Sequence, residues 1–420
     1  MTKSELSKEL ENILSIYKQY KDKNLNLDLS RGKPGNEQLK ISEKMLDSLT
    51  ASSEYMSENG FDCRNYGLLE GLPRMKRIFA SMLEVDEESV IVGGNSSLNL
   101  MFDVISCFVT QGAEGSKPWN KQGKIKFLCP VPGYDRHFSI LEYYDIEMIN
   151  VPMLKDGPDM DKVESLIEKD ESIKGIWCVP KYSNPQGITY SDSVVKRFAS
   201  LKPKAKDFRI FWDNAYAIHD INDTHDKLLS ISKECKKVGN EDIVIQFCST
   251  SKITFPGSGV AAVSASKLNL DMIRKRLLVQ TIGYDKLNQL RHILFFNDFS
   301  GMLEHMKKHK KILKPKFDLA LDILEKNFHE NNIVTWIRPN GGYFISIDVL
   351  NGLAKRVVDL CKQAGVKLTP AGSTYPYKND PNDSNIRLAI TYPPLDELKT
   401  AMDLLCVCIK IASLEKLINE

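Results

Sequence analysis

The sequence predicts an α/β protein in which a large domain with a mostly parallel sheet is followed by a smaller α+β domain. Three observations support this fold class: apolar runs rich in β-branched and aromatic residues alternate with helical patterns, polar clusters follow several of these runs, and the pattern changes after about residue 300. Alternation of strands with helices is typical of a parallel sheet with crossover helices. The length of 420 residues allows two or three domains, or one large domain with a smaller one attached.

Six apolar runs are the expected strands of the large domain, and helical spacing predicts helices between them. The strands are 89–92, 125–129, 173–179, 209–212, 243–247 and 260–265, and the helices are 95–108, 161–169, 192–200 and 268–279. A Lys-rich helical segment over residues 301–326 then leads to two strands near residues 342–347 and 386–390. At the start of the chain, apolar residues from Leu6 to Tyr17 recur at helical spacing between charges, which is unlike a secretory signal.

Composition excludes several function classes. The 57 basic and 55 acidic residues leave a formal net charge of +2, so no net field attracts nucleic acid or an anionic membrane. The chain has no uncharged apolar run long enough to span a bilayer, and its nine cysteines include no C-x-x-C pair. We therefore expect a soluble cytoplasmic protein with reduced thiols, no metal site, no nucleic-acid or membrane partner, and a small-molecule ligand.

The run IVGGNSSLNL at residues 91–100 leads from a strand through glycines into a helix. Backbone N–H groups at such a helix start, together with the hydroxyls of Ser96 and Ser97, form a cradle for phosphate. Taken alone, the run is better explained by Asn95 and Ser96 capping the helix. By itself this motif is therefore weak.

Two further strands lead to polar side chains. The segment FWDNAY at residues 211–216 ends a strand at Asp213 and continues to Tyr216; a carboxylate there holds a protonated ring nitrogen, and a tyrosine reaches a phenolate on the same ring. The segment VPKYSNPQG at residues 179–187 is a turn by its chemistry and presents Asn184. Taken singly, a capping aspartate, a core tyrosine and an ordinary loop explain these residues.

The sharpest signal is CSTSKITFPG at residues 248–257, which places Lys252 directly after an apolar strand and among hydroxyls and glycines. A lysine whose pKa is lowered by burial or by a neighbouring cation forms a Schiff base with an aldehyde. An exposed loop lysine is the commoner case. However, the cradle, asparagine, aspartate, tyrosine and lysine all follow strands, which favours one shared site.

With these motifs the sequence resembles the fold-type I pyridoxal 5′-phosphate (PLP) aminotransferases, in particular the aspartate aminotransferase branch, some of whose phrases also occur in MocR-like proteins. The resemblance extends from LSRGKPG at residues 29–35 to Arg387, through PGYDRH, YSNPQG, TSKITF, GGYFISID and LTPAG. It implies a large PLP-binding domain over residues 50–300 with a mostly parallel seven-stranded sheet flanked by helices. The small domain would combine residues 1–49 and 301–420.

The resemblance also implies a role for each matching residue. Lys252 would bind the cofactor aldehyde and move the proton between substrate and cofactor, with Asp213 paired to the pyridinium nitrogen. The other implied residues are Asn184 and Tyr216 on the phenolic oxygen, Tyr134 stacked on the ring, His137 behind the aspartate, Ser96, Ser97 and Ser249 on the phosphate, and Arg387, Gly32 and Asn184 on the substrate. Tyr66 falls at a position that reaches the phosphate of the neighbouring subunit, which implies a homodimer.

The sequence departs from the family pattern at two points. Family members usually carry an arginine eight residues after the lysine, where this chain has Val260; we expect Ser258 and the Gly257 region to replace it in part. For the arginine that binds a distal carboxylate, the candidate is Arg136, two residues from the stacking Tyr134. Arg31 and Arg291 are the alternatives. Any of the three that does not bind a substrate carboxylate is an ordinary charged residue at the surface.

The resulting hypothesis is a homodimeric aminotransferase that converts L-aspartate to oxaloacetate and then 2-oxoglutarate to L-glutamate at one site, by a ping-pong mechanism. Three alternatives stay open: another amino-acid specificity, a PLP-dependent lyase or decarboxylase, and, less favoured, a PLP-binding regulator domain. A regulator would need a winged-helix module, and only about 30 residues precede Gly32. Reaction type depends on which bond at Cα is perpendicular to the ring, which a sequence does not display.

Overall fold

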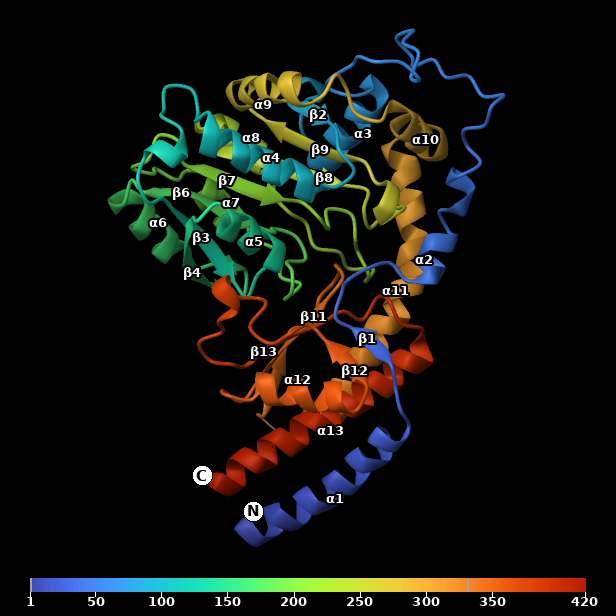
Figure 1. Cartoon of the computed structure of the whole chain (residues 1–420), viewed down its shortest axis with the longest axis vertical. Helices are drawn as coiled ribbons and strands as arrows, with labels where there is room; N and C mark the ends of the chain where they lie inside the picture. The colour runs from blue at the N-terminus through green and yellow to red at the C-terminus, as the bar shows by residue number, and fades with distance from the viewer. Residues whose placement is uncertain (1, 331) are drawn as a thin grey trace.

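The structure, a computed structural model, describes residues 2–330 and 332–420 and has two lobes (Figure 1). The upper lobe contains an eight-stranded sheet, whose order is β2 (Val90–Val92), β9 (Ala261–Ala265), β8 (Val244–Ser249), β7 (Arg209–Asp213), β6 (Ile173–Cys178), β3 (Lys126–Val131), β4 (Glu147–Leu154) and β5 (Gly157–Pro158). The five strands from β8 to β4 run parallel, whereas β9 is antiparallel to both its neighbours and β5 to β4.

This sheet confirms the predicted fold class. All six expected strands of the large domain are present within two residues of their predicted limits. Seven strands form the expected sheet, and the two-residue β5 adds an eighth at its edge. The sequence analysis missed β4, because this strand beside the sheet edge is partly exposed and has no continuous apolar run.

Helices cover both faces of the sheet. One face packs against α4 (Ser97–Thr110), α5 (Asp135–Tyr143) and α9 (Lys267–Gln280), and the other against α6 (Met160–Lys169), α7 (Asp192–Ala199) and α8 (Ile231–Lys237). Near β2 and β9, α3 (Pro73–Leu83) and α10 (Lys286–Phe296) enclose a further apolar cluster. The parallel strands are thus buried on both faces, so their carboxyl ends are the edge where a ligand can bind.

The lower lobe combines the two ends of the chain, which lie close together in Figure 1. Its strands are β10 (Val334–Trp336), β11 (Ile345–Val349) and β13 (Asn385–Leu388), which are antiparallel, and β1 (Leu27–Leu29), which pairs in parallel with β12 (Val366–Leu368). Its helices are α1 (Lys3–Asp22), α12 (Ala354–Gln363) and α13 (Leu395–Asn419). The Tyr17 hydroxyl donates to the Leu360 carbonyl at 2.7 Å, which attaches α1 to α12.

One long helix extends through both lobes, and a short helix packs on it. The long α11 (Phe299–Phe328) starts beside α10 in the upper lobe and ends in the lower core (Figure 1). The short α2 (Asn36–Lys40) follows β1 and packs on α11. The packing of apolar residues between positions 6 and 29 with others between 313 and 414 supports a small domain made of both ends, and the division at residues 49 and 300 stays a prediction.

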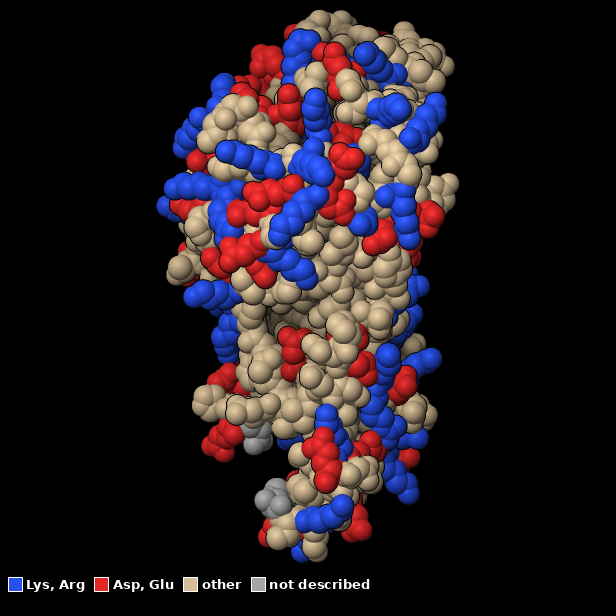
Figure 2. All heavy atoms as spheres, turned by 90° about the vertical axis from the view of Figure 1, so that its left-hand side faces the viewer, with Lys and Arg blue, Asp and Glu red and all other residues tan. Residues whose placement is uncertain are grey.

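On the face shown in Figure 2, basic and acidic side chains are interspersed, with a mostly uncharged band across the middle. Within residues 2–330 and 332–420, no helix is both long and apolar enough to cross a membrane.

Candidate active site

Two adjoining cavities open at the carboxyl ends of the parallel strands. The inner cavity, of about 220 Å³, is lined by Ser96, Ser97, Leu98, Met101, Tyr134, Val179, Asn184, Asp213, Ala215, Tyr216, Ser249, Ser251, Lys252 and Pro256. The outer cavity, of about 460 Å³, adds residues of the lower lobe, among them Gly32 and Arg387. Lys252, Tyr216, Asn184 and Tyr134 line both cavities. The structure therefore brings together side chains that the sequence places at five separate strand ends.

Asp213 ends β7 and is buried at the base of the inner cavity. Its Oδ2 lies 3.1 Å from Nε2 of His137, and the His137 ring stacks on Trp177 at 4.3 Å with an interplanar angle of 11°. Its Oδ1 has no hydrogen-bond partner among the described residues. A buried carboxylate oxygen without a donor is costly, so a protonated ring nitrogen in the cavity fits this oxygen.

Lys252 follows β8, in the turn of residues 250–254, and its ammonium lies 5.0 Å from the ring centroid of Tyr216. Burial lowers the pKa of Lys252 below its ordinary value of 10.5, while the charge of Asp213 opposes this shift. A larger share of the amine is therefore neutral and able to attack an aldehyde. Burial also raises the pKa of Tyr134 to about 12 and that of Tyr216 well above 10, so both phenols remain O–H donors.

Serines gather at the other end of the inner cavity. Ser96 caps α4 by accepting from the Asn99 N–H at 3.4 Å, and Ser97 begins the helix, so the cap and the anion cradle are the same feature. Ser249 donates to Ser251 at 3.0 Å, and both line the cavity. Ser251, which sequence reasoning missed, stands in the same run of hydroxyls as Lys252.

The structure places the expected substitute for the phosphate-binding arginine elsewhere. Ser258 does not line the inner cavity: its hydroxyl donates to Oδ1 of Asn288 at 3.1 Å. Val260, at the position of the family arginine, is buried in the apolar cluster beside β2 and β9. The serine hydroxyls at the cavity are therefore those of Ser96, Ser97, Ser249 and Ser251, and the partial replacement by Ser258 has no support in this geometry.

Arg387 projects from β13 into the wall between the cavities and is buried. Its Nη1 donates to Asp135 at 3.0 Å and to Asn184 at 3.3 Å, and the guanidinium lies over the Phe344 ring at 5.0 Å. Its Nε–H has no partner among the described residues. An anionic group in the outer cavity can therefore accept from this donor.

The loop after β1 forms one wall of the outer cavity. The Leu29 carbonyl accepts from the Ala389 N–H at 3.1 Å, which holds this loop beside Arg387. At Gly32 an added Cβ would lie 2.3 Å from the Phe344 ring, so only glycine fits this approach.

Basic side chains surround the rest of the outer cavity. Of the three candidate arginines, Arg31 and Arg136 line it and are exposed, whereas Arg291 on α10 does not reach it. Lys33 and Lys367 also line it, and sequence reasoning missed both because they come from distant segments. Tyr66 lies outside both cavities, with 77% of its surface exposed.

Comparison with known proteins decides the family. A family model described as aspartate amino-transferase matches residues 1–420. The chain belongs to this family. An aspartate aminotransferase from Corynebacterium glutamicum is 44% identical over 410 residues, which cover 97% of this chain and 94% of that protein. The crystal structure of an aspartate transaminase from the same species has a TM-score of 0.96 and 43% identity, covering 99% of this chain and 98% of that one.

More distant structures share the fold. An α-aminoadipate aminotransferase from Thermus thermophilus, solved with N-(5′-phosphopyridoxyl)-L-leucine, has a TM-score of 0.75 at 19% identity and covers 93% of both chains. The enzyme is therefore a fold-type I aminotransferase that uses PLP. The inner cavity fits that cofactor, because it combines an amine, an unpaired carboxylate oxygen and a group of hydroxyl donors.

Proposed function

We propose that this aminotransferase moves the amino group of L-aspartate to 2-oxoglutarate, by a ping-pong mechanism that uses one site for both substrates. The observation that carries the proposal is the charge of the outer cavity. Besides Arg387 and Lys252, four basic side chains line it, namely Arg31, Lys33, Arg136 and Lys367, and the one acidic residue among its described lining, Asp135, is already paired with Arg387. Such a cavity favours substrates with two carboxylates, and the relative that is 44% identical carries the name aspartate aminotransferase.

Each residue of the inner cavity has a task in this proposal. Bound PLP supplies an aldehyde that condenses with amines and a ring that accepts the electrons left at the substrate Cα. Lys252 would hold the cofactor through its amine and would move the proton at the substrate Cα. Asp213, held by His137, would accept a hydrogen bond from the ring nitrogen, and the phenol of Tyr216, which lines the same cavity, would donate toward the phenolic oxygen.

Further side chains hold the two reactants in place. Asn184 reaches both the cofactor oxygen and the substrate, because it lines both cavities and contacts Arg387. Tyr134 packs against the ring, and the serines Ser96, Ser97, Ser249 and Ser251 bind the phosphate. Arg387 holds the α-carboxylate and Gly32 lets the loop approach it. Arg136 is the proposed partner of the distal carboxylate.

We also propose that the enzyme is a homodimer in which Tyr66 acts in the neighbouring active site. Tyr66 is exposed, and so are the apolar residues Leu278, Val279 and Ile282 at the end of α9 and just beyond. The backbones of Gly67 and Gly283 approach closely. The loop of residues 65–71, called here the Tyr66 loop, and the segment after α9 therefore present one surface. An exposed apolar surface of this kind is typical of an interface.

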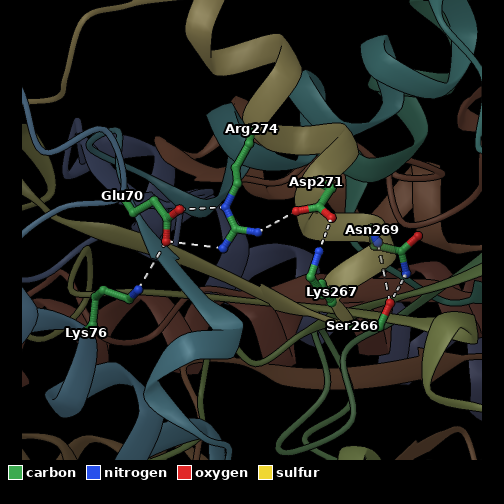
Figure 3. Close-up of polar contacts among 7 residues, drawn as sticks. All are labelled: Glu70, Lys76, Ser266, Lys267, Asn269, Asp271 and Arg274. Carbon is green, nitrogen blue, oxygen red and sulfur yellow. Dashed lines mark hydrogen bonds and ion pairs between the residues drawn. The ribbon is translucent and has the colours of Figure 1, made fainter.

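Ion pairs hold the Tyr66 loop against α9 (Figure 3). Arg274 of α9 binds Glu70 at 2.5 Å and Asp271 at 2.8 Å, and Lys76 of α3 binds the same Glu70 at 3.1 Å. These bonds lower the pKa of Glu70, so the bridge is charged at neutral pH. These ion pairs therefore fix the Tyr66 loop and α9, the two elements of the proposed interface, relative to each other.

The first experiment mixes purified PLP-loaded enzyme with L-aspartate and no oxo acid. We expect the visible band of the lysine-bound cofactor to disappear, and one oxaloacetate to be released per site. Addition of 2-oxoglutarate then restores the band and releases glutamate. A band that aspartate leaves unchanged would show a different amino-acid specificity. Release of ammonia with pyruvate, or of carbon dioxide, would show a lyase or a decarboxylase instead.

A further inference from the structure

Four buried histidines surround the turn that carries Lys252, and none of them has a task in the proposed chemistry. Nε2 of His305 and Nε2 of His309 lie 3.0 and 2.8 Å from the Ile253 carbonyl oxygen. His219 approaches the Lys252 carbonyl at 3.4 Å, and His292 contacts the Thr254 hydroxyl at 2.9 Å. The turn is therefore held by imidazoles on several sides.

His309 has a defined orientation in this cluster. Its Nε2–H donates to the Ile253 carbonyl, so its Nδ1 is the acceptor and receives the Gln38 amide N–H at 3.1 Å. Burial lowers the pKa of His309 to about 4, which keeps the ring neutral and this arrangement intact at neutral pH. His309 thus connects the Lys252 turn to α2, a helix from the other end of the chain.

Gln38 is fully buried and uses both ends of its amide. Besides His309, its Nε2 donates to the Tyr343 hydroxyl at 2.7 Å, and its Oε1 accepts from the Gly35 N–H at 3.1 Å. Gly35 follows the loop of residues 31–33 that lines the outer cavity. The Tyr343 ring lies 5.8 Å from the Lys252 ammonium.

We propose that Gln38 and His309 are positioning residues, which fix the Lys252 turn and the substrate loop of residues 31–35 as one unit. The proposal rests on the role assigned to Lys252 above. Without Gln38, the acceptor Nδ1 of His309 and the Gly35 N–H lose their partners together, so the two segments become independent. Because reaction rates depend on sub-ångström placement, this separation reduces turnover although neither residue touches a reactant.

An apolar residue of similar size at position 38 fills the space without these bonds. Replacement of a buried polar group by an apolar one is often tolerated when both partners are satisfied elsewhere. Here the partners stay behind: the His309 imidazole, the Tyr343 hydroxyl and the Gly35 N–H all lose their bond to the amide. The polar link therefore defines a position that packing alone does not define.

The test compares Gln38→Leu, His309→Leu and His309→Gln with the unaltered enzyme. In the apoprotein, reductive methylation of Lys252 is followed against pH by mass spectrometry, and hydrogen exchange is measured at residues 30–40 and 250–254. We expect both leucine variants to raise the methylation midpoint toward the ordinary lysine value and to speed exchange in both segments. In the loaded enzyme, turnover falls about 10- to 100-fold. His309→Gln keeps a donor for Ile253 and retains most of the turnover.

Gln289→Leu is the matched control, because Gln289 is a buried amide that binds the Leu72 N–H at 2.8 Å and has no bond to the Lys252 turn. It leaves the methylation profile of Lys252 unchanged. If the Gln38 variant has the same profile and turnover as this control, or if exchange rises only at residues 30–40, the proposed link is wrong. Lys252→Ala tests the proposed active site separately from the proposed link through Gln38 and His309. If this variant still attaches the cofactor covalently, the role assigned to Lys252 is wrong.

Discussion

At the scale of single residues, Arg387, the proposed ligand of the α-carboxylate, is held in place through one nitrogen of its guanidinium. Its Nη1 is used by Asp135 and Asn184, and its Nε–H is unpaired among the described residues. The pair with Asp135 holds the side chain in place before substrate arrives. Arg136, in contrast, is exposed and has no ion pair with any residue that the structure describes, so it contributes charge to the cavity with less geometric precision.

The first prediction concerns this difference. Arg136→Ala should lower kcat/KM for aspartate and glutamate about tenfold, which corresponds to about 1.4 kcal/mol, and largely spare neutral amino acids. Arg387→Ala should lower kcat/KM for every amino acid, because all carry an α-carboxylate. Steady-state kinetics with aspartate, glutamate and alanine measure both effects, with Arg291→Ala, outside the cavity, as the control. Equal losses on all three substrates in Arg136→Ala would contradict its assignment to the distal carboxylate.

At the scale of elements, the start of α4 combines two tasks in one side chain. Ser96 accepts the Asn99 N–H as the N-cap and also lines the inner cavity. The positive end of the helix dipole favours both the cap and a bound phosphate. The sequence alternatives for this segment, a cap or a cradle, therefore do not exclude each other.

Ser96→Asp separates the two tasks. Aspartate is as good an N-cap as serine, so the free energy of unfolding of the apoprotein should change by less than about 0.5 kcal/mol. Its carboxylate repels the phosphate, so the dissociation constant for PLP should rise at least about tenfold. Urea unfolding and fluorescence titration measure the two quantities. Unchanged PLP affinity would place the phosphate elsewhere. Ser89→Asp, away from the cavity, is the control.

Helices α10 and α11 supply a second prediction at this scale. Burial lowers the pKa of His292, His305 and His309 from an ordinary 6.5 to about 4. Between these values the unfolded chain binds protons that the folded chain does not. Stability is therefore complete above about pH 6.5 and falls as the pH drops toward 4, by up to about 1.4 kcal/mol per pH unit for each histidine.

Urea unfolding of the apoprotein between about pH 7 and about pH 5 checks this slope. His292→Asn should weaken the pH dependence, since one of the three groups no longer titrates. His329→Asn, at an exposed position, should leave the dependence as it is. Constant stability over the range, or a rise on acidification, would show that these imidazoles are not held neutral.

At the scale of the whole molecule, the site exists only where the two lobes meet. The upper lobe contributes Lys252 and Asp213, and the lower lobe contributes Arg387 and Phe344 to the same pair of cavities. On the proposal of a shared active site, a second copy adds Tyr66. The apolar surface near Tyr66 is the part of the molecule where assembly can be tested.

Ile282→Asp places a charge on this surface, where 64% of the isoleucine is exposed. We expect the variant to sediment as a monomer and to bind PLP more weakly, because Tyr66 of the neighbouring subunit is lost. Leu154→Asp is the matched control, since Leu154 is an exposed leucine on β4 and should leave the assembly unchanged. A dimer of normal PLP affinity in Ile282→Asp would move the interface elsewhere.

Local patterns in the sequence were sufficient for much of the fold and for the centre of the site. The strands that end near Asn184, Asp213 and Lys252 are mostly apolar segments, and such segments depend only on neighbouring residues. The polar side chains that follow them meet because parallel strands share an edge. The pairing of each residue with a cofactor atom came from the resemblance to a family, and it stays a proposal here.

The sequence by itself determined the α/β class, the strand-end residues and the neutral charge balance, because each is a property of short segments or of composition. The tertiary structure decided that Asp135 pairs with Arg387, that Lys33 and Lys367 join the outer cavity, that Ser258 turns to Asn288, and that Gln38 meets His309. The hydrogen bonds among these join residues from 30 to 271 positions apart. No local spacing encodes them, since they arise only when distant segments of the chain pack together.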